Sequence, residues 1–101
     1  MKTELESRGW KHYPESGGFP EYYGKAYPDA PPCNLNKHGV VLVINVSRWG
    51  EHVGYEIELR AEKPDGVWCR LVAYGVEEEK FLAALDPQIS QLLTAWKALN
   101  P

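Results

Sequence analysis

The stretch YEIELRAEKPDGVWCRLVAY, residues 55–74, decides the fold. In its first half, apolar residues at positions 55, 57, 59 and 61 alternate with charged ones, which is typical of a β-strand with one buried face. Lys63-Pro64-Asp65-Gly66 then predicts a tight turn, because proline presets the first turn angle and glycine accepts a left-handed conformation. The stretch is therefore predicted to form a β-hairpin.

The turn also predicts which residues face each other. If Lys63 faces Val67, each apolar residue on one face meets an apolar residue of the other strand, because side chains alternate along both strands. The predicted apolar pairs are Ala61–Cys69, Leu59–Leu71 and Ile57–Ala73. The second face then carries the pairs Glu62–Trp68, Arg60–Arg70, Glu58–Val72 and Glu56–Tyr74. A slip of one residue would put the carboxylates into the core, so this register is strongly favoured.

Two flanking segments complete the predicted regular structure. Val40-Val41-Leu42-Val43-Ile44-Asn45-Val46 is too short for a typical helix and predicts a central strand covered on both sides. Downstream, Glu77 to Glu79 suit a first helical turn. Asp86-Pro87 predicts the end of that helix and the start of another, with Asp86 as the N-cap. The second helix is predicted over residues 87–99, where apolar residues recur at helical spacing: Ile89, Leu92, Leu93, Trp96 and Leu99.

The N-terminal segment is rich in aromatic residues, glycine and proline. Six of the twelve aromatic residues lie in it: Trp10, Tyr13, Phe19, Tyr22, Tyr23 and Tyr27. The prolines and glycines argue against a long helix or a central strand, while the aromatic content argues against a disordered tail. We expect an irregular ordered arm that covers the second face of the sheet. Residues 3–8, before it, form either a frayed helical turn or no regular structure. Tyr22 and Tyr23 are adjacent, so in an extended chain one points inward and the other outward.

These elements predict one α+β domain over residues 1–101. Its parts are an aromatic arm at 1–39, an antiparallel sheet at 40–74 and two helices at 75–99 packed on one face. The sheet has three strands, or four if the arm joins it. A chain of 101 residues is long enough for a single core without metal or disulfide support.

Composition and charge exclude some classes of protein. The net charge of −3 argues against a non-specific nucleic-acid binder, which needs a basic stripe to displace counterions. Val40 to Ile44 is far shorter than the roughly 20 residues of a membrane span, and the first residues lack the apolar core of a secretory signal. We therefore expect a cytoplasmic protein. Cys33 and Cys69 are the two cysteines, and in a reducing cytosol a bridge between them is not favoured.

No catalytic, metal or cofactor site is predicted. His12, His38 and His52 with Cys33 are the candidate metal ligands, but they lack the paired spacing of zinc sites. Cys33 could act as a nucleophile with a histidine as base, yet no nucleophile elbow or oxyanion glycine motif accompanies it. We expect a protein that is not an enzyme.

The aromatic residues are the best candidates for a binding site. Tyrosine and tryptophan are enriched at interface hot spots, although in a small domain they also complete the core. The candidate binding residues are Tyr13, Phe19, Tyr22, Tyr23, Tyr27, Trp49 and Trp68. The expected function is protein binding, as a monomer or homodimer, without direct contact to nucleic acid or membrane. The alternative is an acidic mimic of nucleic acid that uses Glu77 to Glu79 and the strand carboxylates to inhibit a nucleic-acid-binding enzyme or defence complex.

The motifs also suggest a resemblance. The N-terminal motif Arg8-Gly9-Trp10…Tyr13-Pro14…Gly17-Gly18-Phe19-Pro20-Glu21-Tyr22-Tyr23…Tyr27, followed by Tyr55 to Leu59 and Pro64 to Trp68, resembles small uncharacterised proteins encoded by bacteriophages and prophages. The resemblance extends over most of the chain, and its motifs are structural in type. It implies a bacterial cytoplasm and an accessory role, such as binding and modulating a host or phage protein. It implies no reaction.

Overall fold

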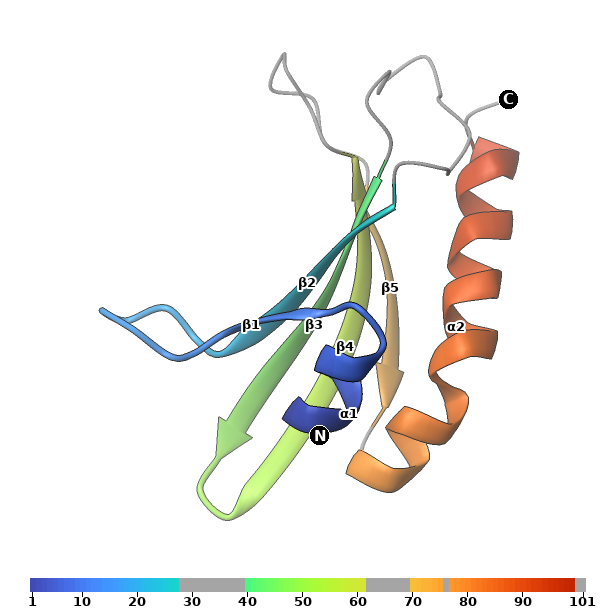
Figure 1. The fold of residues 1–101 in the computed structure, drawn as a ribbon. Helices are drawn as coiled ribbons and strands as arrows, with labels where there is room; N and C mark the ends of the chain where they lie inside the picture. Colours follow the sequence, from blue (N-terminus) through green and yellow to red (C-terminus); the bar gives the residue numbers. More distant parts are fainter. Residues whose placement is uncertain (28–39, 62–69, 76, 100–101) are drawn as a thin grey trace.

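The computed structural model describes residues 1–27, 40–61, 70–75 and 77–99, and places them in one sheet and two helices (Figure 1). The helices are α1 (Lys2–Ser7) and α2 (Glu78–Leu99). The strands are β1 (Lys11–Tyr13), β2 (Tyr22–Tyr27), β3 (Val40–Trp49), β4 (His52–Ala61) and β5 (Arg70–Gly75). The predicted α+β class with an antiparallel sheet is confirmed, and of the two alternatives for residues 3–8 the helical one is found, as α1.

The sheet has the spatial order β1-β2-β3-β4-β5, and every neighbouring pair is antiparallel. It consists of four longer strands and the three-residue β1 at one edge. The prediction of three or four strands was therefore short by β1. The prediction of an irregular arm over the second face was wrong, because β2 pairs with β3 from Tyr22↔Asn45 to Tyr27↔Val40. The N-terminal segment extends the sheet edge instead of covering it.

The hairpin register predicted from residues 55–74 is confirmed where the structure describes it. Leu59 pairs with Leu71, and Ile57 pairs with Ala73. On the alternate positions Glu58 pairs with Val72. The predicted turn, Trp68 and Cys69, the predicted partner of Ala61, lie outside the described residues.

Two glycine turns shape the N-terminal half of the sheet. Gly17 and Gly18 both have positive φ angles, and the flanking Ser16 and Phe19 exchange backbone hydrogen bonds of 3.1 and 2.9 Å. A two-residue hairpin loop needs this left-handed backbone, which glycine adopts without steric cost. The loop makes the segment between β1 and β2 a hairpin that projects beyond the rest of the sheet (Figure 1).

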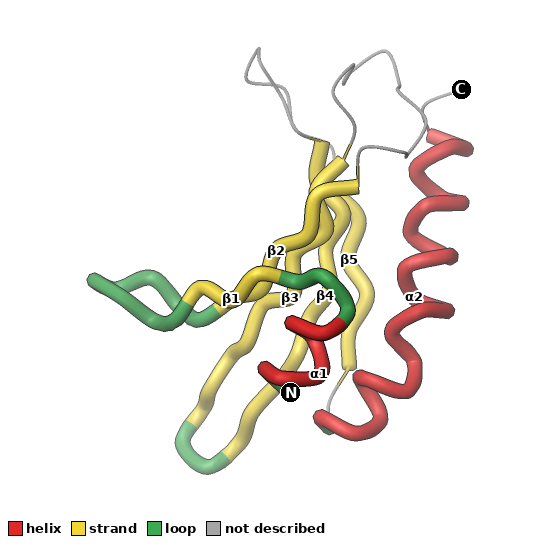
Figure 2. Tube along the Cα trace, viewed as in Figure 1, coloured by secondary structure: helices red, strands yellow, loops and turns green. Residues whose placement is uncertain are grey.

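One apolar core lies between the sheet and the two helices, which share one side of the sheet in Figure 2. It is formed by Leu5, Trp10, Tyr23, Val40, Leu42, Ile44, Val46, Ile57, Leu59, Phe81, Leu85, Leu92 and Trp96. The expected division between adjacent tyrosines is confirmed, since Tyr23 is 3% exposed and Tyr22 is half-buried on the opposite face. For β3, the described helices cover one side, and Val43 on the other side is also buried, at 5% exposure, so the predicted cover on both sides is confirmed at this position.

The two helices predicted at the C-terminus are one helix. Pro87 lies inside α2, where its missing N–H removes one hydrogen bond and costs roughly 3 kcal/mol. Phe81 and Leu85 before it and Leu92 and Trp96 after it are all buried in the same core. Each such side chain contributes roughly 1.5–3 kcal/mol on burial, so their sum outweighs the cost of the proline. Local sequence signals at Asp86-Pro87 were overridden by packing.

Helix α1 is held by contacts that are distant in sequence. Leu5 is fully buried in the core, although α1 has only six residues. The N-terminal ammonium of Met1 lies 2.7 Å from Oε1 of Glu78, at the start of α2. A helix this short is marginal by itself, so burial and this ion pair hold it in place.

Truncating Trp96 should destabilise the protein strongly. The indole is 1% exposed, and Trp96→Ala removes it from the core, so we expect the free energy of unfolding in urea to fall by roughly 3–5 kcal/mol. Gln91→Ala, on the exposed side of the same helix, is the control and should change it by less than about 0.5 kcal/mol. Equal stability of the two variants would contradict this assignment of the core.

Replacing Pro87 should stabilise the protein. Pro87 is exposed, so Pro87→Ala restores a helical hydrogen bond without opening a cavity. The gain is reduced by the greater freedom of the unfolded chain, which leaves about 1–2 kcal/mol in urea unfolding. Ser90→Ala is the control within α2. Loss of stability in Pro87→Ala would show that the helix needs the proline for its path over the sheet.

Candidate functional site

The face of the sheet away from the helices is formed by alternate residues of β1 to β4. We call it the open face. Its described members are Lys11, Tyr13, Tyr22, Gly24, Ala26, Val41, Val43, Asn45, Ser47, Trp49, His52, Gly54, Glu56, Glu58 and Arg60. Strand pairing aligns them in rows, such as Lys11, Gly24, Val43 and Glu58. Neither described helix packs on this face (Figure 2).

Tyr13 and Tyr22 form a stacked pair on the open face. Their ring centroids are 4.5 Å apart and their planes differ by 7°. The two residues are direct partners in the β1–β2 pairing, which brings their side chains together. Tyr13 also lies over Gly24, where an added Cβ would be 3.5 Å from Tyr13 Cε2. The ammonium of Lys11 lies 5.1 Å from the centre of the Tyr13 ring, within cation–π range.

A groove of about 570 Å³ runs beside the tyrosine pair. Val41 and Val43 line it together with Tyr13 and Tyr22. Three cationic residues, Lys11, Lys25 and Arg60, also line it. Lys25 pairs with the buried Leu42, so it is not one of the alternate residues of the open face and lines the groove from the edge of β2. None of the described residues that line it is acidic, although the whole chain carries a net charge of −3. We call this feature the basic groove.

Phe19 and Trp49 are the large apolar side chains that the described residues leave most exposed. Phe19, at the tip of the β1–β2 hairpin, is 72% exposed and lines two hollows of about 230 and 490 Å³ that both include Tyr22. Trp49, at the end of β3, is 65% exposed. A Cβ at Gly54 would be only 2.8 Å from Trp49 Cζ3, so the indole lies over this glycine.

The structure divides the seven predicted binding residues. Tyr13 and Tyr22 lie on the open face, and Phe19 adjoins them, while Trp49 lies at the far end of β3. Tyr23 is a core residue, so only its backbone is near the site. The backbone of Tyr27 ends β2, and Trp68 lies outside the described residues. Lys11, Lys25 and Arg60 were not among the predicted binding residues, although the alternation of Lys11 with Tyr13 could have placed this cation beside the tyrosine.

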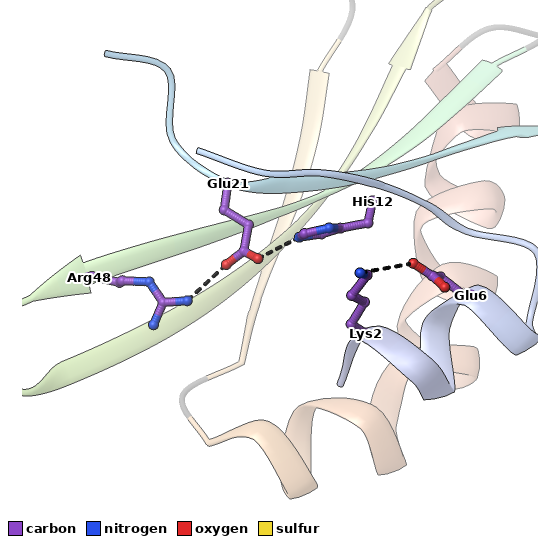
Figure 3. Close-up of polar contacts among 5 residues, drawn as sticks. All are labelled: Lys2, Glu6, His12, Glu21 and Arg48. Atoms are coloured by element: carbon purple, nitrogen blue, oxygen red, sulfur yellow. Dashed lines mark hydrogen bonds and ion pairs between the residues drawn. The ribbon is translucent and has the colours of Figure 1, made fainter. Parts of the chain in front are cut away.

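Glu21 joins three strands on the side of the sheet that faces the helices. Its Oε2 lies 2.6 Å from His12 Nε2, and its Oε1 accepts a hydrogen bond of 2.8 Å from Arg48 Nη2 (Figure 3). Burial alone would raise the pKa of the Glu21 carboxyl, but the hydrogen bonds and charges of His12 and Arg48 outweigh it, so this pKa is lowered from 4.5. The carboxylate therefore fastens the β1–β2 hairpin to β3.

The strand carboxylates are engaged within the fold. Glu58 is fully buried, and its Oε2 accepts a hydrogen bond from Arg60 Nε. Glu56 Oε1 accepts a hydrogen bond of 3.3 Å from Asn45 Nδ2. A mimic of nucleic acid needs a row of exposed negative charges. This arrangement of Glu56 and Glu58 does not favour that role.

The described residues hold no cluster of side chains suited to binding a metal ion. Within residues 1–27, 40–61, 70–75 and 77–99, no three or more histidine, cysteine, aspartate or glutamate side chains gather as metal ligands would. Cys33 and His38 lie outside the described residues, and His12 is paired with Glu21. No helix in the described part of the chain has both the length and the apolar character to cross a membrane.

Removing the charge of Glu21 should make stability less dependent on acid pH. A lowered pKa in the folded state means that the carboxylate stabilises the fold above about pH 4.5, and that this stabilisation is lost as the pH falls through the folded-state pKa. We expect Glu21→Gln to melt below the wild type at pH 7, with the gap narrowing in acid. Glu15→Gln, an exposed neighbour, is the control. A gap that stays constant down to pH 3, roughly one unit below the ordinary glutamate value, would contradict the charge-based role.

Comparisons of the chain with protein families, with curated proteins and with solved structures find no match. The resemblance to small phage and prophage proteins therefore stands on the sequence motifs alone. Any function has to be argued from the open face and its surroundings.

Proposed function

We propose that this protein is a non-enzymatic protein-binding module that contacts its partner through the open face and the β1–β2 hairpin. The observation that carries the proposal is the exposure of Phe19 beside the stacked pair Tyr13 and Tyr22. Exposed aromatic side chains next to a hollowed surface are typical of interface hot spots, because they bury large area at low entropic cost. An apolar surface of this kind also favours association in general.

The firm attachment of the β1–β2 hairpin to the sheet supports a role in binding. The hairpin that carries Phe19 is tied to β3 by Glu21, and its tip is closed by the paired backbone hydrogen bonds of Ser16 and Phe19. A partner would therefore meet a surface ordered in advance, which lowers the entropic cost of binding. If the resemblance to phage and prophage proteins holds, the partner is a host or phage protein in the bacterial cytoplasm, and binding modulates it.

Truncation of the exposed aromatic residues should abolish partner capture. The tagged chain and the variant Phe19→Ala would each be used to capture proteins from a bacterial lysate, followed by mass spectrometry. We expect a protein captured by the wild type to be lost from Phe19→Ala, because hot-spot truncation costs at least about 2 kcal/mol, roughly thirtyfold in affinity. Phe19→Tyr keeps a ring and should keep most of the capture, and Gln91→Ala, on α2, should keep all of it.

A further variant separates this proposal from acidic mimicry. Glu77 and Glu79 are exposed at the start of α2, away from the open face. The double variant Glu77→Gln/Glu79→Gln should capture the same partner as the wild type. Loss of capture in that variant, with normal capture by Phe19→Ala, would overturn the proposal in favour of the mimic.

A further inference from the structure

The basic groove lies where β1 stops and β2 continues. Strand β1 pairs with β2 only from Tyr22 to Gly24. Before Lys11 the chain leaves the sheet, because the N–H of Trp10 donates to the carbonyl oxygen of Leu5 in α1, at 3.0 Å. Within the described part of the chain, the outer edge of Lys25–Tyr27 consequently has no strand partner. An unpaired strand edge offers backbone donors and acceptors to an added strand.

Charge around this edge points to an acidic ligand. Lys11 and Lys25 approach the groove from β1 and β2, and no described lining residue is acidic. Arg60 is paired with Glu58, so the net positive charge comes from the two lysines. Lys25 Nζ donates to the carbonyl oxygen of Arg8 at 2.8 Å, which holds the ammonium at the edge of the sheet. On a chain with net charge −3, this local reversal of sign favours binding of an anion at this place.

The apolar lining argues for a peptide. Val41, Ala26 and the tyrosine pair provide apolar surface next to the lysines, which suits a segment with both apolar and acidic side chains. Single-stranded nucleic acid fits less well. One face of each stacked tyrosine is already occupied by the other ring, and two lysines are few for a polyphosphate backbone.

We propose that the basic groove binds an extended acidic segment of the partner protein, which adds as a strand along the edge of β2 at Lys25–Tyr27, where the described residues supply no strand partner. This inference rests on the proposed protein-binding function and names the chemistry of its partner. The carboxylates of the segment contact Lys11 and Lys25, and its apolar side chains lie on Val41 and Ala26. Backbone hydrogen bonds supply affinity, and the two lysines supply preference for acidic sequence.

Defined peptide probes test the proposal with the full chain. The first probe is a short fluorescein-labelled peptide of glutamate and valine residues, and the second has lysine in place of every glutamate. The third is the glutamate peptide methylated on alternate backbone nitrogens, which cannot form a strand ladder. The fourth is a labelled oligothymidine. Fluorescence anisotropy at low and high salt should show that the first probe binds most tightly and that salt weakens it.

Variants in which a groove lysine is replaced by glutamate test whether the two lysines attract the acidic peptide. Lys11→Glu/Lys25→Glu should weaken binding of the glutamate peptide by at least about tenfold, because two attractions become repulsions. Lys80→Glu, an exposed lysine on α2, changes charge away from the groove and should leave binding unchanged. Lys25 also donates a hydrogen bond to the carbonyl oxygen of Arg8, so circular dichroism would check that the double variant is folded. If it is not, the single variant Lys11→Glu, which changes an exposed residue, tests the same prediction.

Each contrary result overturns a stated part of the inference. Equal binding of the glutamate and lysine peptides would overturn the acidic preference. Undiminished binding of the methylated peptide would overturn strand addition, and tighter binding of oligothymidine would assign the groove to nucleic acid. These results are distinct from a failure of the proposed function, which would appear as capture unaffected by Phe19→Ala while the probes still bind.

Discussion

The pairing of β2 with β3 is the interaction on which the rest of the structure depends. It joins the N-terminal segment to the sheet through six residue pairs, from Tyr22↔Asn45 to Tyr27↔Val40. Because side chains alternate along a strand, the same pairing directs Tyr23 into the core and Tyr22 to the open face. Without it, β1 and the basic groove would have no support, and Trp10 and Leu5 would lose their place in the core.

The same pairing explains how a small domain combines a core with an accessible apolar surface. The two helices pack on one side of the sheet, where the buried apolar residues form one cluster. On the opposite side Val43 is 5% exposed, and Glu58 is buried beside Arg60. A buried carboxylate requires compensating hydrogen bonds. The open face is consequently part apolar and part polar, and the aromatic residues concentrate near the β1–β2 hairpin.

The local pattern of apolar and polar residues in the sequence predicted much of the sheet, but fewer of the residues of the candidate binding site. The alternation from Tyr55 to Arg60 was enough for the β4–β5 register, because a slip of one residue would bury the carboxylates. The two-residue hairpin at Gly17-Gly18 was readable in principle, since paired glycines are a common hairpin signal. It was missed because the prolines around it suggested an irregular arm. Among the predicted binding residues, Tyr13, Phe19, Tyr22 and Trp49 were exposed or half-buried, and Tyr23 was a core residue.

The sequence by itself determined the α+β class, the strand at residues 40–46, the helical character of the C-terminus and the opposite directions of Tyr22 and Tyr23. These depend on periodicity, which acts between near neighbours in the chain. Only the tertiary structure decided that α2 continues through Pro87, that the N-terminal segment joins the sheet edge, and that Lys11, Lys25 and Arg60 share a groove. Those outcomes depend on burial and strand pairing between distant residues, whose energies outweigh the local preferences of proline and glycine.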